Sequence, residues 1–208
     1  MATYHLRMYS LRLGLVGFVV ASSYGVSLQN ATTRIAFGSC NMQHEPQPLW
    51  QEILRLHQEE PLDLWVWGGD NIYADRRRSF TERAYLYLQG NEHASDMFEA
   101  ATPSKLRAEY QRQLRHPGYA SLVRNIPVVG IWDDHDYGIN DGNKNFASKS
   151  ESKEIFLDFI GAPKNDPRRS RDGVYSAHTV GSGEHTIKVI LLDVRYNRDP
   201  WPHQKASG

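Results

Sequence analysis

The sequence predicts an α/β fold, because short apolar runs typical of buried strands alternate with segments whose apolar residues recur at helical spacing. The strand-like runs lie at residues 34–37, 64–67 and 128–132. Polar or acidic side chains follow each of these runs directly. Because ligands of open α/β sheets collect outside the carboxyl ends of the strands, this pattern also predicts where a functional site lies.

The segments between the strands support the same fold class. Apolar residues at helical spacing predict helices at residues 49–56, 105–115 and 150–160. Residues 173–180 and 186–193 are predicted to pair as a β-hairpin across a Gly-Ser-Gly turn. The polar stretch from residue 76 to about residue 102 has no clear period, so no element is assigned to it.

Composition excludes several function classes. The 208 residues suffice for one domain or for part of a larger one. Lys plus Arg equals Asp plus Glu at 24 each, so no overall charge favours nucleic acid or stable membrane association. The sequence has no Gly-x-Ser-x-Gly elbow and no phosphate-binding Gly-Lys-Ser/Thr loop. Function is therefore expected from local sites, while the oligomeric state stays open.

The N-terminus has the order of a secretory signal peptide. Basic residues precede an apolar run at residues 13–21, and small residues follow it, which predicts a signal peptide over residues 1–23. A buried N-terminal strand or a short anchor is the alternative. Residues 24–33 are predicted to be a linker, and Asn30 begins a glycosylation sequon. The sequence therefore predicts a glycoprotein of the secretory pathway that is secreted to the extracellular space or delivered to a vacuole.

Two acidic clusters follow predicted strands. Asp133, Asp134 and Asp136 surround His135 after the third strand, and Asp70 with Asn71 follows the second. Carboxylates that lie close together repel one another, and burying them costs several kcal/mol unless a cation compensates. The only cysteine, Cys40, follows the first strand and would lie beside both clusters. The pattern predicts a metal centre at the carboxyl edge of the sheet.

The donor types indicate two kinds of cation. Carboxylate and amide oxygens suit calcium, magnesium or manganese, whereas a thiolate and a phenolate favour trivalent iron. Asp70 could bridge two ions, and Cys40 and Tyr73 could join it if the loop curls. Asp134, His135, Asn140 and Asp141 could complete a second, harder site. Two adjacent cations catalyse displacement at phosphorus, which predicts phosphoester hydrolysis.

Each of these residues also has a purely structural interpretation. Tyr73 could be a packed aromatic residue with a satisfied hydroxyl group, and Cys40 a small buried hydrophobe. His135 could simply hydrogen-bond to a neighbouring carboxylate. The conjunction of three clusters at three strand ends favours the metal centre over these alternatives.

The motifs resemble those of one known family. Gly38-Ser39-Cys40, residues 69–75, Trp132-Asp133-Asp134-His135-Asp136 and residues 192–196 occur in the order seen in the alkaline phosphatase D (PhoD-like) family of metallophosphoesterases. The resemblance implies a four-layer sandwich, with two central sheets flanked by helices, over residues 34–200, followed by a tail at residues 201–208. It also implies hydrolysis of a phosphomonoester or phosphodiester substrate at a centre of Fe(3+) and Ca(2+).

The resemblance assigns roles residue by residue. Its expected metal ligands are Cys40, Asp70, Tyr73, Asp134 and Asn140. Its expected catalytic residues are His135 and Asp134, and its expected substrate-binding residues are Asn71, His135 and Arg195. The family's later Gly-Asp-x-His segment has no counterpart after Arg195, so the fold is expected to be incomplete. The alternative function is that of a truncated, non-catalytic metal-binding or regulatory fragment of such an enzyme.

Several other side chains carry structural expectations. Tyr85, Tyr87 and Tyr110 are predicted to lie in the core, and Arg168, Arg169 and Arg171 to face solvent. Arg195 is expected to pair with Asp193 or with a motif carboxylate. The run at residues 76–78 could attract phosphate, although a solvated loop is favoured.

Overall fold

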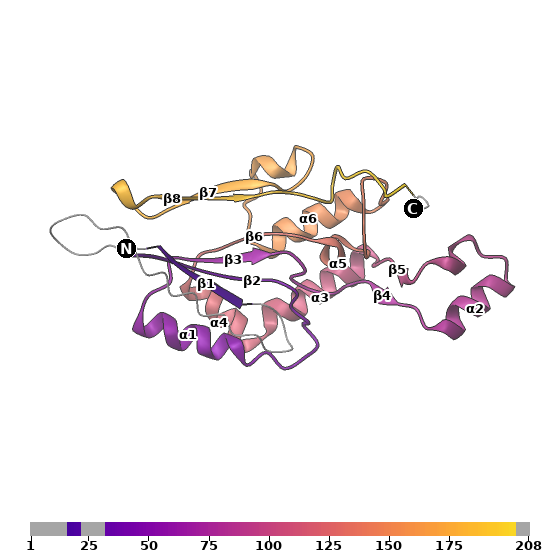
Figure 1. The fold of residues 1–208 in the computed structure, drawn as a ribbon, viewed down its shortest axis with the longest axis horizontal. Coiled ribbons are helices and arrows are strands. Elements are labelled where there is room, and N and C mark those ends of the chain that lie inside the picture. Colours follow the sequence, from indigo (N-terminus) through magenta and orange to yellow (C-terminus); the bar gives the residue numbers. More distant parts are fainter. Residues whose placement is uncertain (1–15, 22–31, 203–208) are drawn as a thin grey trace.

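The centre of the computed structural model, which describes residues 16–21 and 32–202, is a four-stranded sheet in the order β1-β2-β3-β6 (Figure 1). Strands β2 (Thr33–Gly38), β3 (Leu64–Gly68) and β6 (Val128–Ile131) are parallel. Their registers place Gly38 opposite Trp67, and Gly68 opposite Ile131. All three therefore end at one edge of the sheet, as the sequence predicts.

Strand β1 (Val16–Ala21) pairs antiparallel with β2, so that Val16 lies opposite Gly38. This strand belongs to the apolar run for which a signal peptide is predicted, and strand formation is the alternative for that run. Residues 1–15 and 22–31, including Asn30 of the sequon, lie outside the described residues. The signal peptide and the glycosylation therefore stay predictions.

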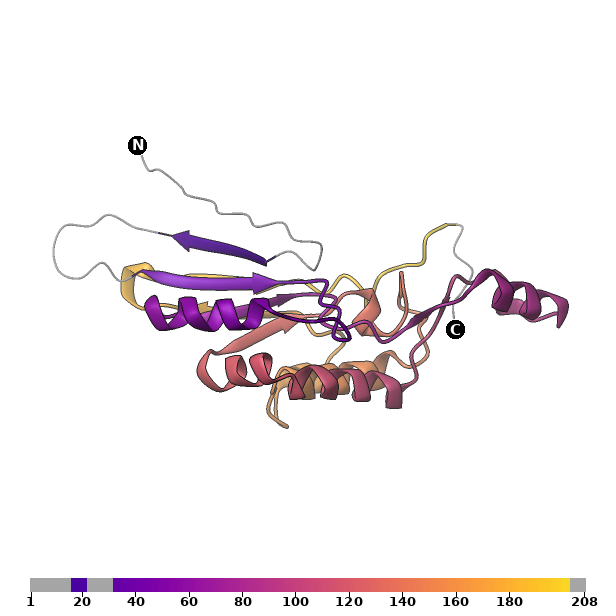
Figure 2. The ribbon, with the colours of Figure 1, turned by 90° about the horizontal axis from the view of Figure 1, so that it is seen from below.

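Four helices form the core together with Trp65 and Trp67 of β3: three of them contact these tryptophans through aromatic side chains, and the fourth packs against two of the others. They are α1 (Leu49–Glu59), α3 (Pro103–Arg115), α4 (Pro117–Asn125) and α6 (Lys149–Phe159). Trp50 of α1 meets Trp65 and Trp67 edge-on at centroid distances of 5.1 and 5.6 Å. Such aromatic pairs add about 0.5–1.5 kcal/mol each beyond the burial of their area. Figure 2 shows α1 alongside the strands and α3, α4 and α6 next to one another.

The stretch without a sequence assignment forms an arm that extends from the body in Figure 1. It consists of β4 (Arg76–Arg77), α2 (Phe80–Leu88), the 3-10 helix η1 (Glu92–Ser95) and β5 (Phe98–Glu99). A capping box formed by Ser79 and Glu82 starts α2. Arg76 pairs with Glu82 and Glu99, so its guanidinium joins parts of the arm to one another. These pairs favour a structural role for Arg76 over binding of phosphate.

Two predictions about side-chain burial are wrong. Tyr85 and Tyr87 are exposed on α2 and do not join the core, because α2 lies in the arm, away from the body, where the described element that it packs against is the short η1. Tyr110 is buried as expected. Arg168 and Arg169 do not face solvent: both side chains are largely buried, in ion pairs with carboxylates near α6.

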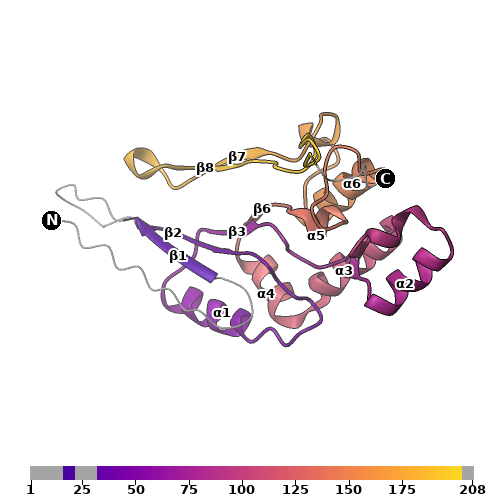
Figure 3. The same ribbon diagram turned by 45° about the vertical axis from the view of Figure 1, so that its right-hand side comes forward.

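The predicted hairpin is confirmed. Strands β7 (Ser176–Val180) and β8 (Ile187–Leu191) pair antiparallel around the 3-10 helix η3 (Gly183–His185). Figures 1 and 3 show this hairpin on the side of the sheet opposite α1 and α4. The predicted α/β class is confirmed, but the four-layer sandwich is not, since the other sheets of the described chain are two-stranded: β4 with β5 in the arm, and this hairpin.

Within the described residues, no helix combines the length and the apolar character needed to cross a bilayer.

Candidate metal centre

Three loops leave the sheet at the edge where β2, β3 and β6 end. The loop after β2 runs beside the loop after β3, with the Cys40 N–H donating to the Gly69 carbonyl at 3.2 Å and the Asn41 N–H to the Asp70 carbonyl at 2.8 Å. The third loop begins α5 (Asp134–Tyr137), and the backbone N–H of His135 donates to Asp70 Oδ1 at 3.3 Å. The backbone thus brings together three segments that are far apart in the sequence.

The backbone at this edge is strained. Among the described residues, the non-glycine positions with positive φ are Cys40 (54°), Asp70 (48°) and Asp141 (57°). Residues with side chains rarely adopt such angles, and they do so mainly where surrounding structure enforces them at functional sites. Gly69 has φ +104°, and a Cβ atom there would lie 2.8 Å from Cβ of Asp133. The close approach of the second and third loops therefore requires glycine at position 69.

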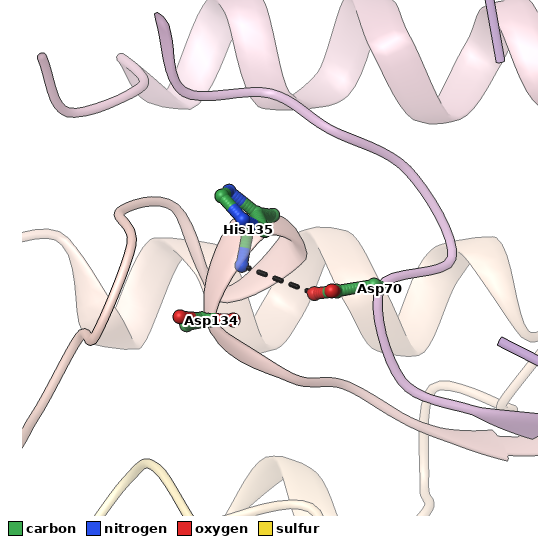
Figure 4. A group of neighbouring side chains, drawn as sticks. All are labelled: Asp70, Asp134 and His135. Carbon is green, nitrogen blue, oxygen red and sulfur yellow. Dashed lines mark hydrogen bonds between the residues drawn. The ribbon is translucent and has the colours of Figure 1, made fainter. Parts of the chain in front are cut away.

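Asp70 is the meeting point of the predicted ligands. Its Oδ2 lies 3.9 Å from Sγ of Cys40 and accepts the Tyr73 hydroxyl proton at 3.2 Å. Ligand atoms of Asp70, Asp134 and His135 all lie within 4.8 Å of one another. Figure 4 shows Asp70 on one segment, and Asp134 with His135 on another. The loop curls as the sequence requires for Tyr73 to reach Asp70.

The negative charge around Asp70 is not compensated by positive side chains. Burial, with added repulsion from Asp134 and Asp133 and despite the opposing effect of His135, raises the pKa of Asp70 to about 6. Burial and the nearby Asp70 raise the pKa of Tyr73 well above its ordinary value, so the phenol stays protonated without a cation. The described chain offers Asp70 no ion pair. A bound cation would reverse both shifts.

His135 is held on three sides. Its Nδ1 lies 2.7 Å from Oδ1 of Asp75, and its ring centroid lies 4.4 Å from that of Tyr73 and 5.6 Å from that of Phe98. Burial lowers the pKa of His135, but the hydrogen bond and charge of Asp75, with those of Asp70 and Asp134, outweigh burial and raise it. The alternative in which His135 hydrogen-bonds to a carboxylate is therefore present, and it leaves Nε2 for another partner.

The segment after α5 wraps around Asp134. The backbone N–H of Asp141 donates to Asp134 Oδ2 at 2.6 Å. The backbone N–H of Asn140 donates to Asp75 at 2.8 Å, and its side-chain amide donates to Asp141. Asp134, Asn140 and Asp141 thus lie together as the predicted harder site requires.

Arg195 pairs with a motif carboxylate, which was one of its two expected partners. Its Nε lies 2.5 Å from Asp133 Oδ1, and its NH2 group lies 3.6 Å from Asp134 Oδ1. Asp193 fixes the segment by accepting the Arg195 N–H at 2.9 Å and the Trp132 indole N–H at 3.0 Å. Arg195 therefore brings positive charge from the end of the hairpin to the third loop.

Asn71 is fully buried beneath the centre. Its side-chain amide donates to Asp136 at 2.6 Å and to the Ile131 carbonyl at 3.0 Å. This geometry favours a structural role for Asn71, tying the second loop to the third, over the contact with substrate that the resemblance implies.

Sequence reasoning assigns no role to Asp75, and to Asp193 only a salt bridge with Arg195, although both stand in the quoted motifs. An acid five residues after Asp70 could have been assigned as a partner of His135, since imidazoles in sites commonly donate to carboxylates. Nothing local to Asp193 indicates that it accepts from Trp132, because that contact depends on the hairpin lying over the third loop.

The donor set fits a pair of cations. Asp70 lies between two kinds of donor. The thiol of Cys40 and the phenol of Tyr73 approach its Oδ2, and they are soft and phenolic donors. Asp134 and the Asn140 segment offer hard oxygen donors. The raised pKa of Asp70 marks a carboxylate whose charge lacks compensation. Cys40 is exposed, so the cluster opens to solvent on that side.

Comparison with known proteins gives one match. A model of the PhoD-like phosphatase family matches residues 35–206, which is most of the chain. No significant match was found among curated proteins, and none among solved structures.

Proposed function

Since the chain belongs to the PhoD-like phosphatase family, we propose that it is a metal-dependent phosphoester hydrolase. The observation that supports this proposal most directly is the convergence of Cys40, Asp70, Tyr73 and Asp134 from three separate loops. Such a cluster of carboxylates is costly to bury unless cations bind to it.

We assign the cations from the family resemblance, with which the donor chemistry is consistent. Cys40, Tyr73 and Asp70 would hold Fe(3+), and Asp134 with Asn140 would hold Ca(2+), with Asp70 shared between the two. When bound, such a pair activates water and stabilises the oxygens of the transition state at phosphorus.

The chain's own residues supply the remaining functions. Arg195, already held by Asp193, would bind an oxygen of the phosphoester through the part of its guanidinium that Asp133 does not occupy. His135 would donate a proton to the leaving oxygen. Asp70 and Asp134 keep the negative charge that the cations require.

The test is metal content together with hydrolysis of chromogenic phosphomonoesters and phosphodiesters by the purified chain. We expect bound iron and calcium, turnover of at least one ester, and loss of turnover by at least about 1,000-fold in Asp70→Asn. Asp63→Asn is the matched control, because the Asp63 carboxylate lies just before β3, at the end of the strand opposite the centre, and accepts the backbone N–H of Arg34. Metal binding without turnover would instead support the non-catalytic fragment.

We also propose that the chain enters the secretory pathway, on the strength of its N-terminal pattern and the sequon at Asn30. Mass spectrometry of the chain expressed in a eukaryotic host should find a new N-terminus near residue 24 and a glycan on Asn30. An intact Met1 in the secreted or vacuolar fraction would contradict the cleavage.

A further inference from the structure

Two side chains of the loop after β2 bond to the backbone of the loop after β3. Gln43 makes a pair of bonds with Tyr73: its Nε2–H donates to the Tyr73 carbonyl at 2.8 Å, and its Oε1 accepts the Tyr73 N–H at 2.9 Å. The side-chain amide of Asn41 donates to the Asn71 carbonyl at 3.0 Å. An amide that both donates to one residue and accepts from it fixes the backbone of that residue as a neighbouring strand would.

The side chain of Gln43 is itself held from behind by α3. Gln43 is buried, and its Nε2 also lies 3.1 Å from Oε2 of Glu109, a buried residue of that helix. One turn further along α3, Gln113 is fully buried, and its Oε1 accepts from the side-chain amide of Asn41 at 2.9 Å. The amide of Gln43 therefore connects a core helix to the backbone of Tyr73.

The position of the Tyr73 backbone decides whether the phenol reaches Asp70. The Tyr73 hydroxyl donates to Asp70 Oδ2 at 3.2 Å, and Sγ of Cys40 lies 3.9 Å from the same oxygen. A tyrosine side chain has few rotatable bonds, so a shift of its backbone moves the hydroxyl as well. The bonds from Gln43 therefore keep the phenol beside the thiol and the carboxylate.

We propose that Gln43 is a positioning residue: by holding Tyr73 against Asp70, it gives this side of the centre its preference for iron. This inference rests on the proposed function for the presence of a metal. A phenolic and a thiol donor beside one carboxylate favour trivalent iron, whereas oxygen donors such as carboxylates suit calcium or magnesium. Without Gln43, the Tyr73 side of Asp70 would lose the donor that distinguishes it from the side at Asp134.

Gln43→Ala is the informative change, because it removes both bonds to Tyr73 and leaves room for water to bond to the freed backbone groups. Gln47→Ala is the matched control. The amide of Gln47 lies in the same network, where it bonds to Gln113 at 3.0 Å in both directions and accepts from the Trp50 indole. Both changes remove amide bonds behind the first loop, and they differ in whether the Tyr73 backbone is freed.

The first measurement needs no metal and no turnover. In the chain labelled with ¹⁵N-tyrosine, the N–H of Tyr73, assigned by its absence in Tyr73→Phe, should exchange at least about 100-fold more slowly than an unprotected amide. Gln43→Ala should speed this exchange by at least about tenfold, and Gln47→Ala should leave it within about threefold. Unprotected exchange in the parent chain, or an unchanged rate in Gln43→Ala, would overturn the pairing.

The second measurement compares the affinities for two ions, by competition of the metal-free chain against an iron chelator and against a calcium chelator. Loss of an outer partner of a metal ligand costs about 10–100-fold in affinity, so Gln43→Ala should weaken iron binding by this factor and calcium binding less than about threefold. The visible tyrosine-to-iron charge-transfer band should weaken with it, whereas Gln47→Ala should keep both. Equal losses for the two ions, an unchanged band, or the same losses in Gln47→Ala would refute the proposal.

A double mutant separates positioning from a general effect on the fold. In the Tyr73→Phe background, Gln43→Ala should cause no further loss of iron affinity, because its effect passes through the phenol. An additive loss would contradict this route. If the parent chain binds iron but hydrolyses no ester, the proposed function fails and the chelator competition still decides the role of Gln43. If the parent chain binds no iron, the preference itself is refuted.

Discussion

Two clusters of carboxylates in this molecule have opposite electrostatic character. Near α6, Glu154 and Asp158 pair with Arg169, and Asp166 pairs with Arg168. The hydrogen bond from Arg168 holds the pKa of Asp166 at about 2. At the sheet edge, burial and neighbouring carboxylates instead raise the pKa of Asp70 to about 6.

The two clusters differ in whether positive side chains compensate their carboxylates, and this difference indicates their roles. Guanidinium groups compensate the α6 cluster within the chain, so that cluster stabilises the fold and needs no ligand. Asp70 has no such partner, and Arg195 is placed against Asp133 and Asp134 rather than against Asp70. An uncompensated acidic site is ready to bind a cation and costs stability until one binds.

The largest expected difference between the clusters is in activity. Asp134→Ala should lower phosphoester hydrolysis by at least about 100-fold, because it removes a hard oxygen donor beside Asp70. Asp158→Ala, at the exposed side of the α6 cluster, should change hydrolysis less than about threefold. Steady-state kinetics at saturating metal measures both, and similar losses would erase the distinction between the clusters.

A pair of glycines tests strain in the two regions. Gly69→Ala should destabilise the fold by about 3 kcal/mol, since it combines φ +104° with a Cβ placed 2.8 Å from Asp133. Gly161→Ala, just beyond α6, has φ +71° and no atom within 4 Å of the new Cβ, so it should cost only about 1 kcal/mol. Urea unfolding gives both values, and equal costs would mean that crowding at position 69 is relieved by loop movement.

In the metal-free chain, two matched substitutions should change the free energy of unfolding in opposite directions. Asp70→Asn should stabilise the fold at pH 8 by about 2 kcal/mol, because it removes a buried charge that lacks compensation. Asp166→Asn should destabilise it by about 1 kcal/mol through loss of the pairing with Arg168. Adding iron and calcium should reverse the sign for Asp70→Asn alone, and a sign that stays the same would argue against binding at Asp70.

The smallest effect is on the pH dependence of stability. The folded pKa of Asp70 is raised, so its contribution favours folding below the unfolded value of about 4 and is lost as the pH rises through about 6. The folded pKa of Asp166 is lowered, so its contribution is present above about 4 and is lost as the pH falls toward 2. The stability difference between the metal-free parent and Asp70→Asn should therefore change between about pH 4 and pH 6. The difference between the parent and Asp166→Asn should change only below about pH 4.

The sequence correctly predicted which loops lie together, because adjacent parallel strands end at the same edge of a sheet. Cys40, Asp70 and Asp134 follow strands that are parallel and adjacent, so their convergence follows once the strands are recognised. Prediction from sequence failed for Tyr85 and Tyr87, because helical spacing does not say whether a helix has a partner to pack against. It failed for Arg168 and Arg169. Arg168 pairs with Asp166 of its own loop, and Arg169 reaches carboxylates of α6 because the loop folds back onto that helix.

The amino-acid sequence suffices to predict the α/β class, the family and the three loops that carry the expected metal ligands, since strand ends and their donor residues are local features of the chain. Three contacts are known from the three-dimensional fold and not from the sequence: Asp75 bonds to His135, Arg195 pairs with Asp133, and Asn71 is buried under the centre against Asp136. Those contacts join residues about 60 positions apart. They depend on which loops pack together and at what depth, and no local pattern encodes that.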